Sequence, residues 1–216
     1  GADQWGNSIA GVDMVRRIEG GEAHVLSAPL IINRATGRKF GKTEGGTVWL
    51  DPELTSPYKF YQFWLNVDDE GVIEYMKVYT LLTKEEIERV AAEQQAAPHL
   101  RVAQKALAWE VTKLVHGEER ALAARQATAV LFGSELFDAS NSSVVEILKA
   151  ELPTASLGNA VTDILVSAQV SDSKGQARRL ISGGALSVNG EKIQEDTVID
   201  TVSLVKKGKN TFILVV

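Results

Sequence analysis

The sequence predicts a multidomain protein that combines an α/β part with an α+β part, and three observations support this fold class. Near the N-terminus, one amphipathic helix pattern is followed by a short apolar run of strand type. Residues 56–133 carry only helical patterns. The C-terminal residues show helix patterns followed by two hairpin signals, of which Asn189-Gly190 is the stronger.

Composition narrows the classes of function. The 216 residues allow one or two domains, and 44% hydrophobic residues are enough for real cores. A formal net charge of −5 argues against a generally basic nucleic-acid binder, so any RNA contact must be local. The lack of cysteine excludes disulfides, thiolate chemistry and a Cys/His metal site, and three scattered histidines do not favour a His-rich site. No apolar run or signal peptide points to a membrane.

A glycine-bracketed turn, Gly1–Asn7, leads into an amphipathic helix that Gly20-Gly21 ends. Backbone N–H groups at such a helix N-terminus can hold a ligand. Asp3 there can accept hydrogen bonds from ribose hydroxyls, and Gln4 can bond a carboxylate or an amide. The alternative is that Asp3 only caps the helix and Trp5 belongs to a core.

Asn33–Thr43, called the basic loop below, combines two glycines with several polar side chains. It follows the apolar run Leu30–Ile32, which is short enough to be a buried strand. Glycine allows tight turns and close approach to a ligand, and lysine suits phosphate oxygens. A loop of this kind can close over a polyphosphate, although a solvated basic hairpin loop is the alternative. Its cations and hydroxyl are Arg38, Lys39, Lys42 and Thr43.

Residues 56–133 predict several short helices that form a bundle. Ser56-Pro57 starts one helix, and Thr83–Glu86 is a capping box at the start of another. We expect the aromatic segment Tyr58–Trp64 to pack in the core, with base stacking as the alternative. The charges of Lys84–Arg89 predict a solvated face, and His116 is expected to be a favourable charge at a helix C-terminus.

The C-terminal residues begin with a segment, 134–158, that reads as a linker with one short helix opened by a capping box at Ser143–Glu146. Two helices and two hairpins follow, the second hairpin with a basic turn at Lys206–Asn210. Residues 153–216 carry seven Lys/Arg and six Asp/Glu, a net +1. These cations predict a local phosphate-binding face, with a solvated surface as the alternative. They are Lys174, Arg178, Arg179, Lys206, Lys207 and Lys209.

Two motifs together resemble tyrosyl-tRNA synthetases of the bacterial type. Asp3–Asn7 reads Asp-Gln-Trp-Gly-Asn, and Lys39–Thr43 resembles that family's version of the class I signature loop, usually written KMSKS. Phe40 stands for the Met, Gly41 for the first Ser and Thr43 for the last. The C-terminal order of helix, Ala-Arg-Arg-Leu-Ile, Gly-Gly and Val-Asn-Gly resembles the S-four-like RNA-binding module that these synthetases carry. The resemblance covers essentially the whole chain.

The resemblance implies a domain organisation. Residues 1–55 would be the C-terminal part of a class I Rossmann-like catalytic domain, 56–133 the α-helical anticodon-binding domain, 134–158 a linker with a short helix, and 159–216 the S-four-like module. Because Gly1 is not an initiator Met and sits where a strand should already have ended, we expect a fragment. The other class I signature and the groups that read tyrosine would lie in the missing half.

The resemblance also implies an activity: ATP-dependent activation of tyrosine to tyrosyl-adenylate and transfer to tRNA(Tyr), in the cytoplasm. ATP would be a substrate with Mg²⁺, with no tightly bound cofactor and no metal held by the protein. We expect a homodimer for the complete enzyme and an inactive fragment, for which the sequence leaves the oligomeric state open, with a monomer as one alternative. The alternative is an RNA-binding fragment or pseudo-enzyme without catalysis. By family match, Lys39, Lys42 and Thr43 hold the pyrophosphate. The residues implied in ATP or adenylate binding are Gly1, Asp3, Gln4, Leu30, Ile31, Ile32 and Lys42.

Overall fold

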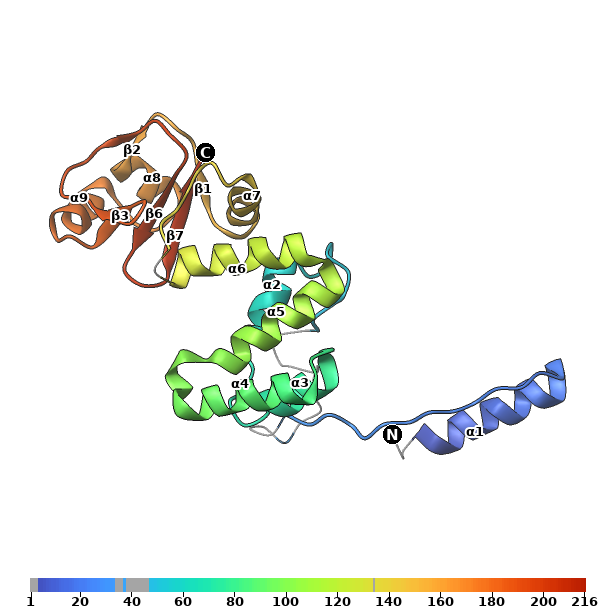
Figure 1. Ribbon diagram of the computed structural model, residues 1–216. Coiled ribbons are helices and arrows are strands. Elements are labelled where there is room, and N and C mark those ends of the chain that lie inside the picture. Colours follow the sequence, from blue (N-terminus) through green and yellow to red (C-terminus); the bar gives the residue numbers. More distant parts are fainter. Residues whose placement is uncertain (1–3, 34–36, 38–46, 134) are drawn as a thin grey trace.

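The computed structural model describes residues 4–33, 37, 47–133 and 135–216. Figure 1 shows three parts in chain order: an N-terminal helix that projects from the rest, a helical bundle, and a C-terminal module built on a sheet. Within these ranges, no helix is both long and apolar enough to cross a membrane.

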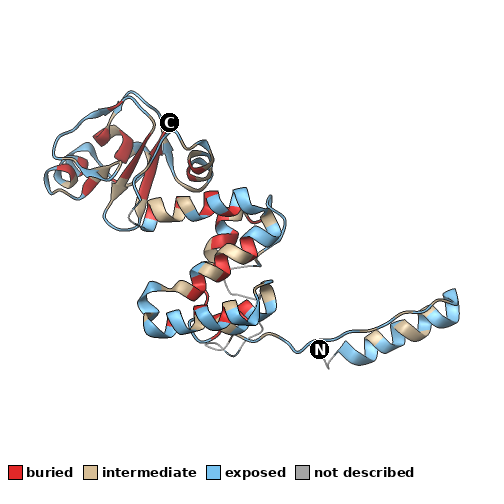
Figure 2. Cartoon of the chain, in the orientation of Figure 1, coloured by how far each residue is buried: buried red, intermediate tan, exposed pale blue. Residues whose placement is uncertain are grey.

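The N-terminal helix α1, Trp5–Met14, continues as the π-helical turn η2, Val15–Glu19. It ends at Gly20, whose φ of +63° is a left-handed conformation that glycine adopts freely, so the predicted helix is confirmed. None of its residues is buried, as Figure 2 shows.

The strand predicted at Leu30–Ile32 is wrong: only Ile32 makes an isolated β-bridge. A strand requires a continuous ladder with a neighbouring strand, and none forms along this run within the described residues. Leu30 and Ile32 are half exposed, whereas Ile31 packs against the helical core. The apolar pattern therefore reflects this one packed side chain.

Aromatic side chains fill the centre of the bundle. Tyr58, Phe60, Tyr61 and Trp64 are all buried, which confirms the predicted core packing. The helices in chain order are α2 (Pro57–Leu65), α3 (Val72–Tyr79), α4 (Lys84–Ala96), the 3-10 turn η3 (Pro98–Leu100), α5 (Val102–His116) and α6 (Glu118–Phe132).

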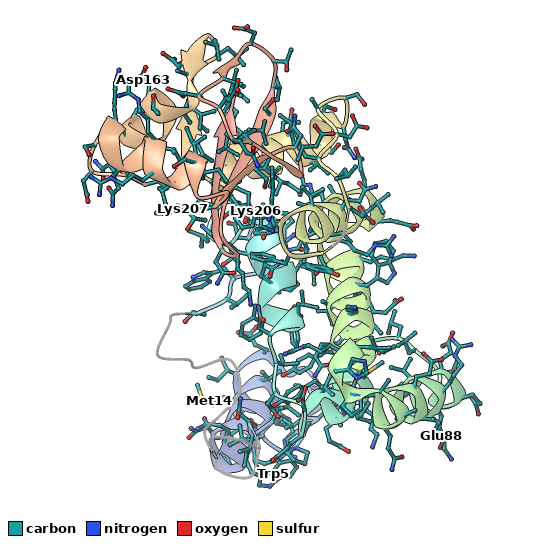
Figure 3. All side chains as sticks on the ribbon, turned by 90° about the vertical axis from the view of Figure 1, so that its left-hand side faces the viewer. Trp5, Met14, Glu88, Asp163, Lys206 and Lys207 are labelled. Carbon is teal, nitrogen blue, oxygen red and sulfur yellow. The ribbon has the colours of Figure 1, made fainter. Side chains whose placement is uncertain are left out.

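Both predicted helix starts are confirmed. The Ser56 hydroxyl accepts a hydrogen bond from the Lys59 N–H, and Pro57 occupies the first turn of α2. Thr83 and Glu86 exchange both capping-box bonds, at 3.3 and 2.8 Å. The charged face of α4 is solvated as expected: the ion pair between Lys84 and Glu88 is largely exposed, and Figure 3 shows Glu88 at the outer edge of the bundle.

The prediction that His116 is a helix-terminal cation is wrong. Burial lowers the pKa of its imidazole, and the nearby Arg120 lowers it further. The ring lies edge-on to Phe60 at 4.7 Å between centroids, and Nε2 is buried without a hydrogen-bond partner among the residues that the structure describes. His116 is therefore mainly neutral at pH 7.

The short helix expected between residues 134 and 158 is α7, Ser142–Glu151. Its predicted capping box is wrong, because the N-cap is Asn141, two residues before Ser143, and Asn141 Oδ1 accepts the Val144 N–H. Val144 and Leu148 are buried in the same core as the bundle. This helix thus packs as part of the bundle.

The C-terminal module is a mixed sheet with two helices. The sheet order is β1-β7-β6-β3-β4, in which β1 and β7 are parallel and the other pairs antiparallel, and β2 pairs separately with β5. Its elements are β1 (Thr154–Ala155), β2 (Asn159–Ala160), α8 (Val161–Ser167), α9 (Lys174–Ser182), β3 (Leu186–Val188), β4 (Glu191–Lys192), β5 (Val198–Ile199), β6 (Ser203–Lys207) and β7 (Thr211–Val215).

Both faces of the central strands are covered. Successive side chains along a strand point to opposite faces. One face, with Val205, Ile213 and Val215, packs with α8 and α9. The other face buries Leu204, Phe212 and Leu214 in the core of the bundle. Figure 1 shows α8 and α9 on one side of the sheet and α6 and α7 on the other.

The two hairpins differ in how well they match expectation. Asn189 and Gly190 both have positive φ, as the predicted Asn-Gly turn requires. The predicted basic turn at Lys206–Asn210 is wrong in extent, because β6 continues through Lys207 and β7 begins at Thr211. Lys206 and Lys207 therefore lie within a strand.

The environment of His116 predicts a pH dependence of stability. With a folded-state pKa below the ordinary 6.5, the unfolded chain binds the extra proton first. The free energy of unfolding therefore has its full value above about pH 6.5, and it decreases as the pH falls from 6.5 towards the folded-state pKa. Urea unfolding at about pH 7.5 and about pH 5.5 should show a smaller pH effect in His116→Leu than in wild type. His99→Asn, which changes an exposed side chain, should keep the wild-type effect; an equal effect in His116→Leu would contradict the assignment.

Candidate nucleic-acid interface

The sequence-predicted ATP site lies only partly within the structure. Gln4 is described: it stands at the N-cap of α1, exposed, and its side-chain oxygen accepts a hydrogen bond from Asn7 at 3.1 Å. Its amide is thus presented to solvent at a helix N-terminus. The predicted residues outside the described ranges are Gly1, Asp3, Lys39, Lys42 and Thr43.

Both described flanks of the basic loop are anchored on the bundle. Upstream, Ile31 packs against the helical core, and downstream Val48 does the same. The Trp49 N–H donates to the Thr55 hydroxyl at 3.0 Å, just before α2 begins. The Gly37 N–H donates to the Asn33 carbonyl at 2.8 Å. The segments on either side of the loop are therefore held by the same core.

The outer face of α9 carries three exposed cations of the C-terminal module. Ala177 and Ile181 bury the opposite face of the helix. Arg178 and Arg179 are exposed and make no ion pair with any described residue. Lys174 is also exposed, but its Nζ lies 2.5 Å from a carboxylate oxygen of Asp163. The two arginines are therefore the most available phosphate-binding groups on this helix.

Lys206 and Lys207 point to opposite faces of β6, as neighbours on a strand must. The Lys206 Nζ lies 5.2 Å from the Phe212 ring centroid, on the bundle side. The Lys207 Nζ donates to the Val170 carbonyl at 3.0 Å, on the side of α8 and α9. Both side chains are half-buried, whereas Lys209 is exposed in the hairpin turn.

The six predicted cations do not form one cluster. Figure 3 shows Lys206 and Lys207 at the end of the module near the bundle, and Asp163 at the far end. Lys174 lies at the far end too, because it pairs with Asp163. The cations are thus separate positive points at both ends of the module, and Lys206 and Lys207 lie on opposite faces of its sheet.

Two features escaped the sequence analysis because they join residues that no local pattern links. The Arg125 guanidinium of α6 stacks on the Trp109 ring of α5 at 4.4 Å.

A cleft of about 550 Å³ lies between α2, α6 and α7. Its wall includes Tyr58, whose pKa is raised to about 12 by burial and by the charge of Glu151. Tyr58 is therefore a neutral phenol at physiological pH.

Two family models match this chain, one over its N-terminal residues and one over its C-terminal residues. Residues 1–133 match the family model of tRNA synthetases class I (W and Y), and residues 145–215 match the tyrosine–tRNA ligase SYY-like C-terminal domain. The chain belongs to the class I tRNA synthetase family of the W and Y type. The resemblance inferred from the two motifs is thereby confirmed, as is a class I synthetase fold of mixed helix and sheet.

Curated relatives point to one member of this family. The chain is 43% identical to tyrosine–tRNA ligase 2 of Bacillus cereus and 46% identical to tyrosine–tRNA ligase of Bacteroides fragilis. Each comparison covers the whole chain but only 54% of the relative, so the chain spans about half their length. A solved structure, of a C-terminally truncated Aspergillus nidulans mitochondrial tyrosyl-tRNA synthetase, shares 33% identity over 61% of this chain and 38% of that chain. The TM-score of this comparison is 0.47.

Proposed function

We propose that this chain supplies the C-terminal half of a tyrosine–tRNA ligase. The complete enzyme would activate tyrosine with ATP and Mg²⁺ as substrates, release pyrophosphate, and transfer the tyrosyl group to tRNA(Tyr). The observation that carries this proposal is the order of the two family matches along a chain whose relatives are tyrosine–tRNA ligases of about twice its length.

The proposed chemistry is positioning and charge stabilisation, with little acid–base work by the protein. Lys39, Lys42 and Thr43 hold the departing pyrophosphate. Asp3 binds the ribose, with Gly1 beside it at the nucleotide, and Gln4 lies by the tyrosine carboxylate. Backbone groups of residues 30–32 contact adenine. Support comes from the exposed Gln4 amide at a helix N-terminus and from the two anchored flanks of the basic loop.

The proposed domain organisation keeps residues 1–55 in the catalytic domain, 56–133 in the anticodon-binding bundle, 134–158 as the connection, and 159–216 as an S-four-like module. The two helices and mixed sheet of the module support an RNA-binding role, with Arg178, Arg179 and Lys209 as exposed cations that make no ion pair with any described residue. Lys174, Lys206 and Lys207 contribute from its two ends. The complete ligase would be a cytoplasmic homodimer. Because the chain spans half of its relatives, RNA binding without catalysis is the second candidate for the chain alone.

The proposed role of the basic loop predicts a defect in rate and not in tyrosine binding. In the complete ligase, Lys39→Ala or Lys42→Ala should slow adenylate formation roughly a hundred- to a thousandfold, because charge develops on the pyrophosphate only during the reaction. Pre-steady-state measurement of adenylate formation gives the rate and the tyrosine dissociation constant together. Lys84→Ala, on the solvated face of α4, serves as the control. A raised dissociation constant with an unchanged rate would show that the loop binds the ground state instead.

The RNA-binding face predicts a change in salt dependence. Binding of tRNA(Tyr) to this chain should weaken in the Arg178→Ala, Arg179→Ala double variant. The slope of log affinity against log salt should become shallower by roughly one to two units. Each phosphate contact that is lost means that fewer counterions are released when the RNA binds. The Lys84→Ala, Arg89→Ala double variant removes two cations of the bundle and should match wild type. A filter-binding salt titration measures both, and the opposite ranking would place the RNA on another surface.

A further inference from the structure

Glu151, the last residue of α7, has an unusual environment. Its side chain is only 10% exposed, and its two carboxylate oxygens have different partners. The Ser56 hydroxyl donates to Oε1 at 2.5 Å, and the Lys59 Nζ lies 3.4 Å from Oε2. Ser56 and Glu151 are 95 residues apart in the chain, so this contact joins two distant segments.

The location is favourable only because of the neighbouring helix. A carboxylate at the C-terminus of its own helix meets the negative end of the helix dipole. Glu151 is placed instead against the N-terminus of α2, where unpaired N–H groups and the positive end of the dipole favour an anion. Ser56 connects the two, since its hydroxyl accepts the Lys59 N–H at 3.2 Å and donates to Glu151.

On one side, Glu151 leads directly into the C-terminal module. After Leu152 the chain enters β1, which runs parallel to β7. The Leu214 N–H donates to the Pro153 carbonyl at 3.0 Å, and the Val216 N–H donates to the Ala155 carbonyl at 2.9 Å. The first hydrogen bond to the module's sheet therefore lies two residues from Glu151, at Pro153, and β1 begins three residues from it, at Thr154.

On the other side, Ser56 stands at the base of the basic loop. Thr55, its neighbour, is buried and accepts the Trp49 N–H, and Val48 packs in the same core. The path from the loop to the first turn of α2 is thus short and held by contacts at each step.

We propose that Glu151 is a positioning residue that, in addition to the apolar contact of the sheet with the bundle, sets the orientation of the C-terminal module relative to the helix following the basic loop. RNA held by the module is then presented to the catalytic part in one orientation. This second statement rests on the proposed function, whereas the mechanical link does not.

The chain offers a matched control for this proposal. Glu146 lies on the same helix and lines the same cleft, but it is exposed and makes no ion pair with any described residue. Glu151→Ala and Glu146→Ala therefore remove the same side chain from the same helix, and only the first removes the bond to α2. Ser56→Ala removes that bond from the other partner.

The mechanical link can be measured on this chain directly. The sequence has no cysteine, so spin labels at Glu88→Cys in α4 and Glu191→Cys in β4 report one distance between bundle and module. Pulsed EPR should give a narrow distribution for wild type and Glu146→Ala. Glu151→Ala and Ser56→Ala should both broaden it, and the double variant should broaden it by less than the sum of the two, since either single change already removes the Ser56–Glu151 bond. An unchanged distribution in Glu151→Ala would overturn the proposal.

The consequence for RNA is measured in the complete ligase. Glu151→Ala should raise the KM for tRNA(Tyr) by up to about tenfold, because the module then samples orientations that do not present the RNA, and it should leave tRNA-independent pyrophosphate exchange unchanged. Glu146→Ala should change neither. Equal losses of exchange and charging would mean that Glu151 only stabilises the fold, and would overturn the positioning role. If the wild-type protein neither bound nor charged tRNA(Tyr), the proposed function would fail while the EPR result still decided the link.

Discussion

The structure depends most on the burial of one face of the C-terminal sheet in the helical core. Leu204, Phe212 and Leu214 share this core with the aromatic centre of α2 and with α6 and α7. Burying each such side chain contributes roughly 1.5–3 kcal/mol. Turning the module away from the bundle would expose these side chains and would therefore cost several kcal/mol of free energy. The flanks of the basic loop enter the same core through Ile31 and Val48. The basic loop and the C-terminal module are therefore both attached to the same hydrophobic core.

Features encoded by a few neighbouring residues could be predicted from the sequence. The Ser56-Pro57 start of α2, the capping box at Thr83–Glu86 and the Asn189-Gly190 turn all form as expected. Each depends on hydrogen bonds or backbone angles within four residues, so the local chemistry decides it. The class of the protein was predictable for a different reason, namely the resemblance of two short motifs to a known family.

Features that depend on distant partners could not be predicted. The run at Leu30–Ile32 has strand composition but no ladder beside it in the described residues. The pKa of His116 is lowered by burial, to which Phe60, far away in sequence, contributes by packing against the ring, and by the charge of Arg120. The contact between Glu151 and Ser56 has no local signal. The exposure of each candidate phosphate-binding cation likewise depends on which sheet face and which helix end it occupies, and this emerges only from the assembled module.

The central claim is that this chain holds the RNA and carries the pyrophosphate loop, while the remaining groups for tyrosine activation come from the rest of the ligase. One preparation of the 216-residue chain tests it most directly, with tRNA(Tyr) binding and tyrosine-dependent ATP–pyrophosphate exchange measured side by side. The claim predicts salt-sensitive binding of tRNA(Tyr) and exchange at the background level. Exchange clearly above background, or no binding of tRNA(Tyr) at low salt, would contradict it.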